Sequence, residues 1–398
     1  MRILNHDYAG HPFQVQLSRA LARRGHDILH IYSASNQTPH GMLTKQVHDP
    51  DHFDIVPLYL SAPFKKYSYW RRRKQEIEYG RLVANEIRRW QPDLVISGNT
   101  PTEAQRLIQR QCRALRRRFI FWVQDVYSIA VHKILRKKLS IIGSIVGHGY
   151  MRIERALLQR SDAVILISED FRPLMERWKI DLDRTHVIHN WAPLEEVPPY
   201  PKPNPWSKQH QLDDVPCLLY SGTLGMKHNP NLLLQLAIHL KGCGQQKVVV
   251  VSEGPGVDWL RQKSAEHRLD NLLIMDWQPF EVLPQVLASA DVLLAVLEPD
   301  AGVFSVPSKV LTYLCARRPV LLAVPADNLA ARIVRDSEAG LLVPPDDVAG
   351  FVQAASRLIG DPELRQTLAA NGRRYAETHF NIDTITDRFE AILQQVAR

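Results

Sequence analysis

Two short segments of the sequence combine glycine, hydroxyl and lysine groups in patterns that could bind a phosphate group. The first is YSGTLGMK, in which Lys227 follows a turn that contains Gly222 and Gly225. In the second, Ser308 and Lys309 follow a proline at the predicted start of a short apolar helix. Lysine supplies positive charge, and the first N–H groups of a helix are free to bind an anion. Each segment also has a simpler interpretation, as a solvated surface lysine and as an ordinary helix start.

Both segments lie in a chain that alternates short apolar strands with amphipathic helices. The predicted strands comprise residues 1–4, 27–32, 93–97, 119–123, 163–168, 186–189, 215–220, 247–252, 272–275, 292–296, 320–323 and 340–342. Such alternation predicts parallel sheets with helices on both faces, in the α/β class. At 398 residues the chain is too long for one core, so we expect two doubly wound, Rossmann-like domains. In such sheets, ligands bind beyond the carboxyl ends of the strands.

A proline-rich segment separates the two predicted domains. Residues 192–214 contain six prolines and show no hydrophobic periodicity, which predicts a linker. We therefore expect an N-terminal domain over 1–191 and a C-terminal domain over 215–379. A break near position 380 precedes a last amphipathic helix, and we expect the segment 380–398 to return to the N-terminal domain.

Charge and cysteine usage limit the classes of function. The net charge is +11 over residues 1–200 and −3 over the remainder, which indicates an acidic partner for the first half. Nucleic acid, an anionic membrane and a phosphorylated substrate all have this property, but no nucleic-acid-binding module is recognisable. The four cysteines are scattered without a C-x-x-C pair, which disfavours a disulfide framework or a zinc site. The absence of a long apolar run or a signal-peptide core predicts a cytoplasmic protein.

Two stretches combine basic with aromatic or aliphatic residues, at 62–74 and 133–146. As one helix, the second stretch would carry a single apolar stripe formed by Leu135, Leu139, Ile142 and Val146. Lysine and arginine beside such a stripe are typical of a helix that lies on an anionic membrane surface. The alternative is a helix that packs on its own domain with its cations in solvent. We favour membrane contact through both stretches.

Several segments, in the right order over nearly the full length, resemble the retaining family 4 of glycosyltransferases with the GT-B fold. In the first half they are HPFQVQLSRALARRGHDILHIY, SDAVILISEDFRPLM and THVIHNWAP. In the second half they are YSGTLGMKHNP, VSEGPG and PFEVLPQVLASADVLL. The segment PSKVLTYLCARRPVL is similar to the subgroup that builds bacterial capsule, O-antigen and exopolysaccharide. No single motif is specific, but the ordered set is.

The resemblance implies two Rossmann-like domains that face a cleft, with the acceptor bound by the N-terminal domain and a nucleotide sugar by the C-terminal domain. It implies transfer of a sugar, with retention and without a metal or other cofactor, from a UDP- or GDP-linked donor. The implied acceptor is a saccharide linked to polyprenyl diphosphate. The enzyme would then work as a peripheral protein on the cytoplasmic face of the plasma membrane.

The resemblance also implies roles for individual residues. Catalytic roles fall on Asp125, Lys227 and Glu298, with Asp300 as an alternative to Glu298. Donor-binding roles fall on Gly10, His11, Gly222, Thr223, Lys227, Glu253, Gly254, Pro279, Ser305, Ser308, Lys309 and Thr312. Asp125 follows a strand and could orient the acceptor hydroxyl or offset charge at the anomeric carbon, while a helix cap is its alternative role.

Two positions depart from the family pattern. Thr223 stands where members usually carry an arginine, and Thr312 stands where a glutamate usually binds the ribose. We expect Lys309 to supply the cation that is missing at Thr223. A pair of aspartates, Asp181 and Asp183, has the letters of a metal-binding D-x-D motif but lies far from the predicted cleft.

Two other functions are compatible with the same architecture. One is a nucleotide-sugar 2-epimerase, which needs no acceptor and leaves the basic stretches unexplained. The other is a partner subunit that binds nucleotide but lost turnover together with the arginine and glutamate. A nicotinamide-dependent oxidoreductase is disfavoured, because neither domain carries G-x-G-x-x-G after its first strand.

Overall fold

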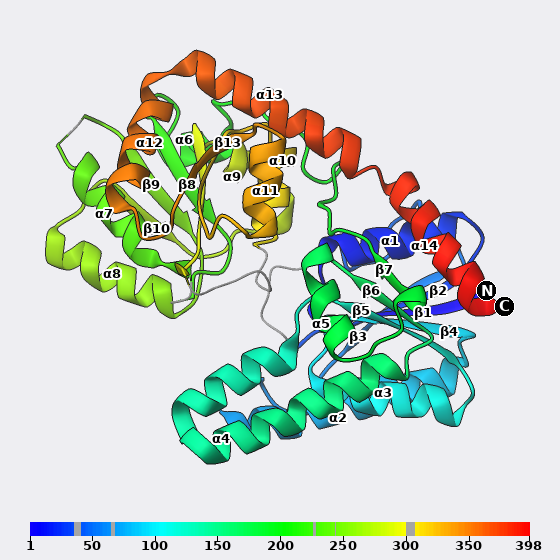
Figure 1. Ribbon diagram of the computed structural model, residues 1–398. Helices are drawn as coiled ribbons and strands as arrows, with labels where there is room; N and C mark the ends of the chain where they lie inside the picture. Colours follow the sequence, from blue (N-terminus) through cyan, green and yellow to red (C-terminus); the bar gives the residue numbers. More distant parts are fainter. Residues whose placement is uncertain (36–40, 65–67, 226–227, 243, 300–306) are drawn as a thin grey trace. The chain divides into compact units, whose positions relative to one another are not determined.

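The computed structural model describes residues 1–35, 41–64, 68–225, 228–242, 244–299 and 307–398. The chain folds into two compact units (Figure 1). The first unit comprises Met1–His189 together with Ile382–Arg398, and the second comprises Asn190–Asn381. Within the described residues, no helix has both the length and the apolar character that crossing a bilayer requires.

The first unit contains a seven-stranded parallel sheet in the order β3-β2-β1-β4-β5-β6-β7. Its strands are β1 (Arg2–Asp7), β2 (Asp27–Ser33), β3 (Phe53–Leu58), β4 (Leu94–Gly98), β5 (Arg118–Val123), β6 (Ala163–Leu166) and β7 (Thr185–Val187). The central strands are covered on both faces, which explains continuous apolar runs such as RFIFWV in β5. The sequence pattern did not predict β3, because this strand lies at the sheet edge, is partly exposed and contains Pro57.

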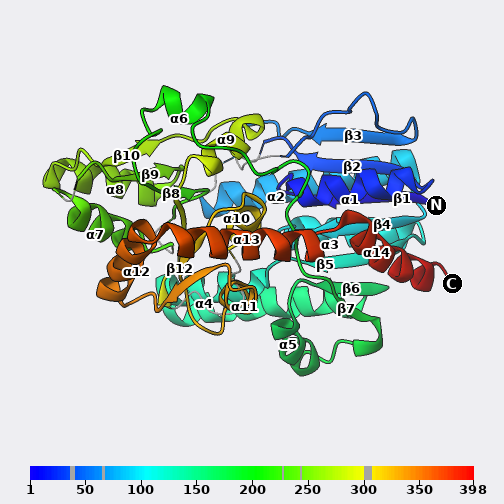
Figure 2. The same ribbon diagram turned by 90° about the horizontal axis from the view of Figure 1, so that it is seen from above.

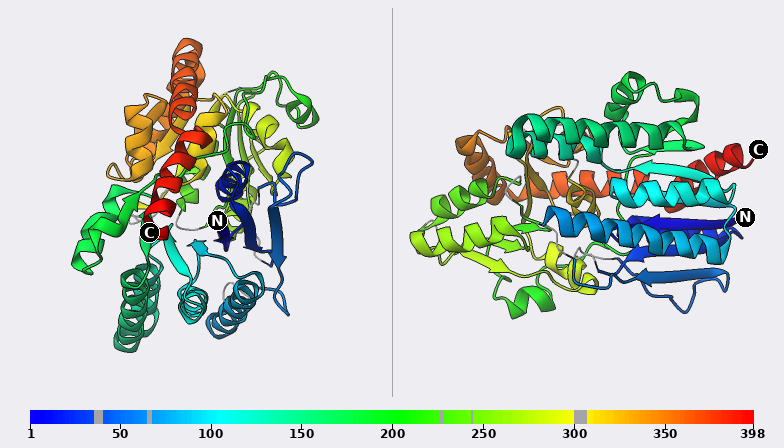
Figure 3. Two further views of the ribbon diagram at one scale, coloured as in Figure 1. Left: turned by 90° about the vertical axis from the view of Figure 1, so that its right-hand side faces the viewer. Right: turned by 90° about the horizontal axis from the view of Figure 1, so that it is seen from below.

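Helices cover both faces of this sheet (Figures 2 and 3). On one face α1 (Pro12–Arg23) packs against α14 (Ile382–Ala397). On the other face α2 (Tyr69–Trp90), α3 (Thr102–Ala114) and α4 (Tyr127–Gln159) lie side by side. A short α5 (Arg172–Arg177) and the 3-10 turns η1 (Glu169–Phe171) and η2 (Leu182–Arg184) complete the unit.

The last helix, α14, is an integral part of the first unit. Phe389 is fully buried, and its ring lies edge-on to that of Trp122 with 5.0 Å between the centroids. Arg24 of α1 donates hydrogen bonds to Asp387 at 2.6 Å and to Glu390 at 2.9 Å. The core of the first unit is therefore closed by residues that follow the whole second unit in sequence.

Helix α4 is a hairpin of two arms, residues 127–139 and 141–159. The chain reverses at Ser140, whose backbone angles (φ 48°, ψ −120°) are not helical. The arms approach closely because Gly143 and Gly147 face the first arm. A Cβ at Gly143 would lie 2.0 Å from the carbonyl oxygen of Leu135, and one at Gly147 would lie 2.7 Å from Cα of His132.

The prediction of one continuous helix with one apolar stripe over 133–146 is therefore wrong. Leu135 and Leu139 belong to the first arm, whereas Ile142 and Val146 belong to the second. Leu135 is buried, while the other three side chains are exposed. Hydrophobic spacing alone missed the reversal, because the tip carries no glycine or proline at the residue that turns.

The second unit contains a six-stranded parallel sheet in the order β10-β9-β8-β11-β12-β13. Its strands are β8 (Cys217–Ser221), β9 (Lys247–Val251), β10 (Leu272–Met275), β11 (Val292–Val296), β12 (Val320–Ala323) and β13 (Gly340–Val343). Its helices are α6 (Pro205–Gln209), α7 (Pro230–Leu240), α8 (Pro255–His267), α9 (Leu283–Ala288), α10 (Lys309–Cys315), α11 (Leu329–Asp336), α12 (Val348–Gly360) and α13 (Pro362–His379), with a 3-10 turn η4 (Phe280–Val282). The α/β class with two Rossmann-like sheets is thus confirmed.

The segment 192–214, expected to be a linker, packs as part of the second unit. Asn204 caps α6 by accepting a hydrogen bond from the N–H of Ser207, and its side chain also donates to the carbonyl of Gln285. Trp206 is buried. Six prolines suggested an unstructured connection, yet proline also suits the first turn of a helix, where its missing N–H is not needed.

Both sheets share one feature that determines where ligands can bind. In each, the first strand lies at the point where the strand order reverses, with its second strand on one side and its fourth on the other. Loops that leave neighbouring strands at this point diverge to opposite faces of the sheet, so an open crevice forms at the carboxyl ends. The crevices lie after β1 and β4 in the first unit, and after β8 and β11 in the second.

We predict that Phe389→Ala lowers the free energy of unfolding of the first unit by about 3–5 kcal/mol, because a large cavity opens against Trp122. Chemical denaturation followed by circular dichroism measures this loss. Gln394→Ala, an exposed position on the same helix, is the control and should change stability by less than about 0.5 kcal/mol. Equal stability of Phe389→Ala and wild type would contradict the assignment of α14 to this core.

Candidate functional site

A buried lysine lies at the crevice of the second unit. The Nζ atom of Lys309 is 3.4 Å from the centre of the Tyr220 ring, near the end of β8. Although Lys309 as a residue is half-buried, Nζ itself is inaccessible and has no hydrogen-bond partner in the part of the chain that the structure describes. A desolvated cation over an aromatic face gains about 2 kcal/mol, which is less than an ammonium group loses when it leaves water.

Helix α10 holds Lys309 in this place. Tyr313 lies one turn after Lys309, on the same side of the helix. Its hydroxyl accepts a hydrogen bond from the N–H of Ser221 at 2.8 Å and donates one to the carbonyl of the same residue at 3.0 Å. Tyr313 is buried, and with its neighbours Val310 and Leu314 it fixes the helix on the sheet. The lysine is therefore positioned by a rigid element.

The electrostatic state of Lys309 follows from its surroundings. Burial lowers the pKa of the Lys309 ammonium group well below its usual value of 10.5. Among the described residues, no carboxylate lies within ion-pair distance of Nζ. An anion that entered the crevice would supply the missing negative charge and favour the charged form of the lysine.

Glycine makes room for the lysine at the end of β8. Gly222 has a φ of +118°, and a Cβ there would lie 3.1 Å from Cε and 3.3 Å from Nζ of Lys309. The carbonyl oxygen of Gly222 accepts a hydrogen bond of 2.6 Å from the hydroxyl of Ser252. Thr223 follows directly, and its carbonyl accepts a hydrogen bond of 2.8 Å from the Tyr220 hydroxyl. The Lys309 ammonium group thus lies at the same turn as Thr223.

The turn after β9 is fixed against the turn after β8. The N–H of Leu224 donates to the carbonyl of Glu253 at 3.1 Å, and the N–H of Gly256 donates to the carbonyl of Leu224 at 2.9 Å. Gly254 has a φ of +120°, and a Cβ there would lie 3.0 Å from the Leu224 carbonyl oxygen. Small residues are required at Gly254 and Gly256 because the two loops touch.

The remaining predicted residues of this unit lie at different distances from Lys309. Glu298 is half-buried two residues after β11, at the same crevice, and Thr312 is half-buried on α10. Ser308 is the exposed N-cap of α10, while the side chain of Glu253 is exposed after β9. Pro279 precedes η4 beyond β10, two strands away from β8, so the fold separates it from the group around Gly222. Three predicted residues, Lys227, Asp300 and Ser305, lie outside the described residues.

The crevice of the first unit is built by the turn after β1. Asp7 is buried and accepts hydrogen bonds from the N–H groups of Ala9, at 3.0 Å, and of His11. Gly10 has a φ of +72°, which allows the chain to turn into α1. The Nε2 atom of His11 lies 2.9 Å from Nδ2 of Asn99, which follows β4. The two strand ends that flank the reversal point are therefore linked by a side-chain contact.

Asp125 is exposed directly after β5, at the same edge of the sheet. The N-cap of α4 is Val126, so Asp125 lies one residue before it. The backbone N–H groups at the start of α4 are instead bound by the buried Glu154, which accepts from Tyr127 at 3.2 Å and from Ser128 at 3.0 Å. Burial raises the pKa of Glu154 to about 7. Glu154 therefore caps the start of α4 from the second arm of the same helix.

Sequence reasoning missed several residues of these crevices, namely Tyr220, Tyr313, Asn99 and Glu154. A signal was present for Tyr313, because KVLTY places an aromatic residue four positions after the lysine. Tyr220 directly precedes the predicted Ser-Gly turn. Asn99 and Glu154 carried no local signal, since their partners are 88 and 26 positions away in sequence.

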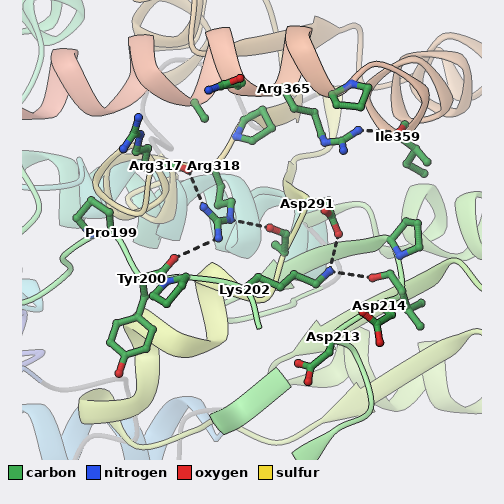
Figure 4. A pocket seen from close by; sticks show the side chains of 18 residues that line it. Pro199, Tyr200, Lys202, Asp213, Asp214, Asp291, Arg317, Arg318, Ile359 and Arg365 are labelled. Carbon is green, nitrogen blue, oxygen red and sulfur yellow. Dashed lines mark hydrogen bonds and ion pairs between the residues drawn. The ribbon is translucent and has the colours of Figure 1, made fainter. Parts of the chain in front are cut away.

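A cavity of about 810 Å³ opens at the other edge of the second sheet, where β8, β11 and β12 begin (Figure 4). Three of the cations that line it are bonded within the chain. Lys202 pairs with Asp291 at 2.7 Å, Arg318 donates to the carbonyls of Ala290 and Tyr200, and Arg365 donates to that of Ile359. These bonds tie the segment 199–216 to the sheet, so we interpret the cavity as structural.

Two family models match the chain. The model described as Glycosyltransferase Family 4 matches residues 13–196, and the model described as Glycosyl transferases group 1 matches residues 215–361. The first match covers most of the first unit. The second covers the six-stranded sheet together with helix α10, which carries Lys309.

Individual relatives are more distant. An alpha-D-kanosaminyltransferase of Streptomyces kanamyceticus is 22% identical over 61% of this chain and 63% of its own length. A probable glycosyltransferase of Pseudomonas aeruginosa, WbjE, is 25% identical over 68% of this chain and 66% of its own length. The chain thus spans just under two thirds of the length of these two relatives.

Solved structures share the fold over the full chain. Sucrose-phosphate synthase from Thermosynechococcus elongatus has a TM-score of 0.73 and 17% identity, and covers 100% of this chain and 99% of its own. Anabaena HepE, solved in complex with UDP and glucose, has a TM-score of 0.72 and 16% identity, with 99% of both chains covered. At this level of identity the likeness shows the GT-B fold alone.

We predict that Lys309→Met stabilises the protein at pH 7, because an apolar side chain of similar length replaces a buried amino group that has no hydrogen-bond partner among the described residues. The melting temperature should rise by about 2–4 °C for each kcal/mol gained. Because the pKa of Lys309 is lower in the folded chain than in the unfolded chain, the unfolded chain binds more protons between the two values. The stability of the wild type therefore rises with pH over this range, and the gap to the variant should close towards pH 10.5.

Thermal melts of both proteins at several pH values measure this effect. Lys208→Met replaces an exposed lysine on α6 and serves as the control, with an unchanged melting temperature. A variant Lys309→Met that is less stable than wild type at pH 7 would mean that the ammonium group makes a net stabilising interaction within the chain, and its assignment to anion binding would fail.

Proposed function

Because the chain belongs to family 4 of the glycosyltransferases with the GT-B fold, we propose that it transfers a sugar from a UDP- or GDP-linked donor to an acceptor hydroxyl, with retention at the anomeric carbon. The proposed acceptor is a saccharide linked to polyprenyl diphosphate, in the assembly of a bacterial surface polysaccharide. The presence of UDP and of UDP-glucose in the HepE structures supports the nucleotide-sugar donor.

The observation that carries this proposal is the buried ammonium group of Lys309, which has no hydrogen-bond partner among the described residues. It lies beside Gly222, at the turn where the family pattern has an arginine and this chain has Thr223. A diphosphate with its oxygens at this turn would place negative charge next to Nζ. The cation that the turn lacks would thus come from α10, and its burial strengthens the interaction by excluding water.

The chemistry needs the donor diphosphate to leave with its bonding electrons. The bond between the anomeric carbon and the phosphate oxygen breaks, and a new bond forms between that carbon and the acceptor oxygen on the same face of the sugar. The acceptor proton passes to the departing phosphate oxygen, so no separate protein base is required. In this proposal Lys309 offsets the charge that grows on the diphosphate, and Glu298 at the same crevice would contact the sugar. No metal or other cofactor takes part in this proposal.

The acceptor side belongs to the first unit. Asp125 lies at the carboxyl edge of its sheet, where it would hold an acceptor hydroxyl or offset charge at the anomeric carbon. A polyprenyl-linked acceptor would be met at the cytoplasmic membrane surface, which the stretches 62–74 and 133–146 are proposed to contact. The protein would then be peripheral on that membrane.

Nucleotide binding tests the donor site directly. In the absence of added metal, UDP or GDP should stabilise the protein by about 2.7 kcal/mol at one hundred times the dissociation constant. Lys309→Met should weaken that binding by about 10- to 100-fold, because a charge-assisted interaction with phosphate is lost. The control Lys208→Met should bind as wild type. No stabilisation by either nucleotide would contradict the donor assignment.

Turnover separates the proposal from its two alternatives. Incubation with a labelled nucleotide sugar and a polyprenyl-diphosphate saccharide should yield product only when both are present, and NMR should show a retained anomeric configuration. Conversion of the free nucleotide sugar without acceptor would indicate a 2-epimerase. Nucleotide binding without turnover on any acceptor would indicate a partner subunit that has lost catalysis.

We predict that Asp125→Asn lowers kcat for transfer by about 100-fold while leaving nucleotide binding unchanged, because the side chain acts at the acceptor and not at the donor. Steady-state kinetics and the nucleotide-induced shift in melting temperature measure the two effects on the same preparation. Asp51→Asn changes an exposed carboxylate that precedes β3, at the opposite edge of the same sheet, and is the control. An unchanged kcat in Asp125→Asn would exclude this residue from the acceptor site.

A further inference from the structure

The tip of the α4 hairpin exposes a cluster of aliphatic side chains. They are Ile134, Leu139, Ile141, Ile142, Ile145 and Val146, each between 38% and 75% exposed. Exposed aliphatic side chains are normal singly, but six within thirteen residues form a contiguous apolar surface on both sides of one reversal. We refer to these six residues as the tip cluster. Such a surface on a soluble domain indicates an interaction site.

Cations surround the tip cluster. Lys133, Arg136 and Lys137 are exposed on the first arm, and the sequence contains no Asp or Glu between positions 126 and 153. The start of α2 adds Trp70, which is 71% exposed, and the exposed Arg71. Arg72 and Ile134 line one small cavity, so the start of α2 lies beside the first arm.

The hairpin is built as a stiff projection. Its two arms approach closely along Gly143 and Gly147, where any larger side chain would meet the backbone of the first arm. At its base the buried Glu154 of the second arm binds the first N–H groups of the first arm. The first arm begins at the carboxyl edge of the sheet and its 13 residues span about 20 Å, so the tip cluster extends beyond that edge (Figure 1).

We propose that the tip cluster inserts into the headgroup and upper acyl region of an anionic phospholipid bilayer, with Lys133, Arg136 and Lys137 bound to the lipid phosphates. This inference rests on the proposed function only in placing the protein at a membrane. The commitment to lipid follows from charge: a second copy of the chain would bring two surfaces of the same sign together, whereas anionic headgroups are complementary. Aliphatic side chains with flanking cations are the combination that binds at a bilayer interface.

The proposal differs from a single helix lying flat on the membrane. Because the arms are antiparallel and closely packed, the exposed residues at positions 139, 141 and 142 lie at the turn. The hairpin would therefore enter the bilayer by its end. The residues that anchor its base, Tyr127 and Ser128, would remain with the sheet, close to Asp125 at the proposed acceptor site.

Co-sedimentation of the purified full chain with vesicles tests the proposal, without donor or acceptor. The probes are phosphatidylcholine vesicles and the same vesicles with about 30% phosphatidylglycerol. Wild type should bind the anionic vesicles at least tenfold more strongly. Replacement of all three cations by glutamine should weaken that binding by roughly 100-fold, because each contributes about fivefold near an anionic surface.

The apolar contribution is tested by a second variant, Ile142→Asn with Ile145→Asn, which should bind at least tenfold more weakly than wild type. The matched control, Val47→Asn with Tyr59→Asn, changes two exposed apolar residues elsewhere in the first unit and should bind as wild type. Circular dichroism and the melting temperature without ligand confirm that each variant is folded.

Three outcomes would overturn the proposal. The first is that wild type fails to bind, or binds both kinds of vesicle equally. The second is that the control variant loses binding as well. The third is that wild type forms a dimer that only the substitutions in the tip cluster dissociate. The last, measured by sedimentation velocity, would assign the tip cluster to a second copy of the chain. Since vesicle binding needs no nucleotide, failure of the donor site and failure of the tip cluster are distinguishable.

Discussion

The arrangement of the crevice in the second unit depends on the burial of the Lys309 ammonium group. A cation without a counter-ion would not remain inside a protein unless the neighbouring structure holds it there. Here a helix anchored through Tyr313, an aromatic ring beneath Nζ and a glycine that leaves space beside it act together. The same desolvation that makes the buried ammonium group costly strengthens the attraction of an incoming diphosphate. The energetic cost of burying the ammonium group and its affinity for a diphosphate thus have the same cause.

The sequence was sufficient to predict most of the helices and strands and their order. It predicted less of how side chains are arranged in the crevices. Most strands are short apolar runs, and their boundaries were predicted within a few residues, because burial on both faces leaves a local pattern. The edge strand β3 and the reversal at Ser140 left none. Lys309 was identified from a lysine at a helix start, but its burial depends on Tyr220, which lies 89 positions earlier in the chain. No local pattern reports such a contact.

Glycine has a common role in the two units, which is to let backbones approach where function needs a rigid arrangement. At Gly222 and Gly254 the backbone adopts positive φ and two strand-end loops are fixed together. At Gly143 and Gly147 the absence of a side chain lets two helical arms pack closely. In both cases neighbouring atoms of the chain occupy the space that a side chain would take. The side chains around each glycine are therefore held in one position.

The return of α14 to the first unit has a consequence for biosynthesis. A ribosome makes the N-terminal strands first, but Phe389 and its neighbours, which cover Trp122, leave the ribosome only after the whole second unit. Until then the nascent first unit exposes apolar surface along α1 and β5, while the second unit has its complete sequence and can fold. We therefore expect the second unit to be finished first, and chaperones that recognise apolar surface to engage the earlier half of the chain during synthesis.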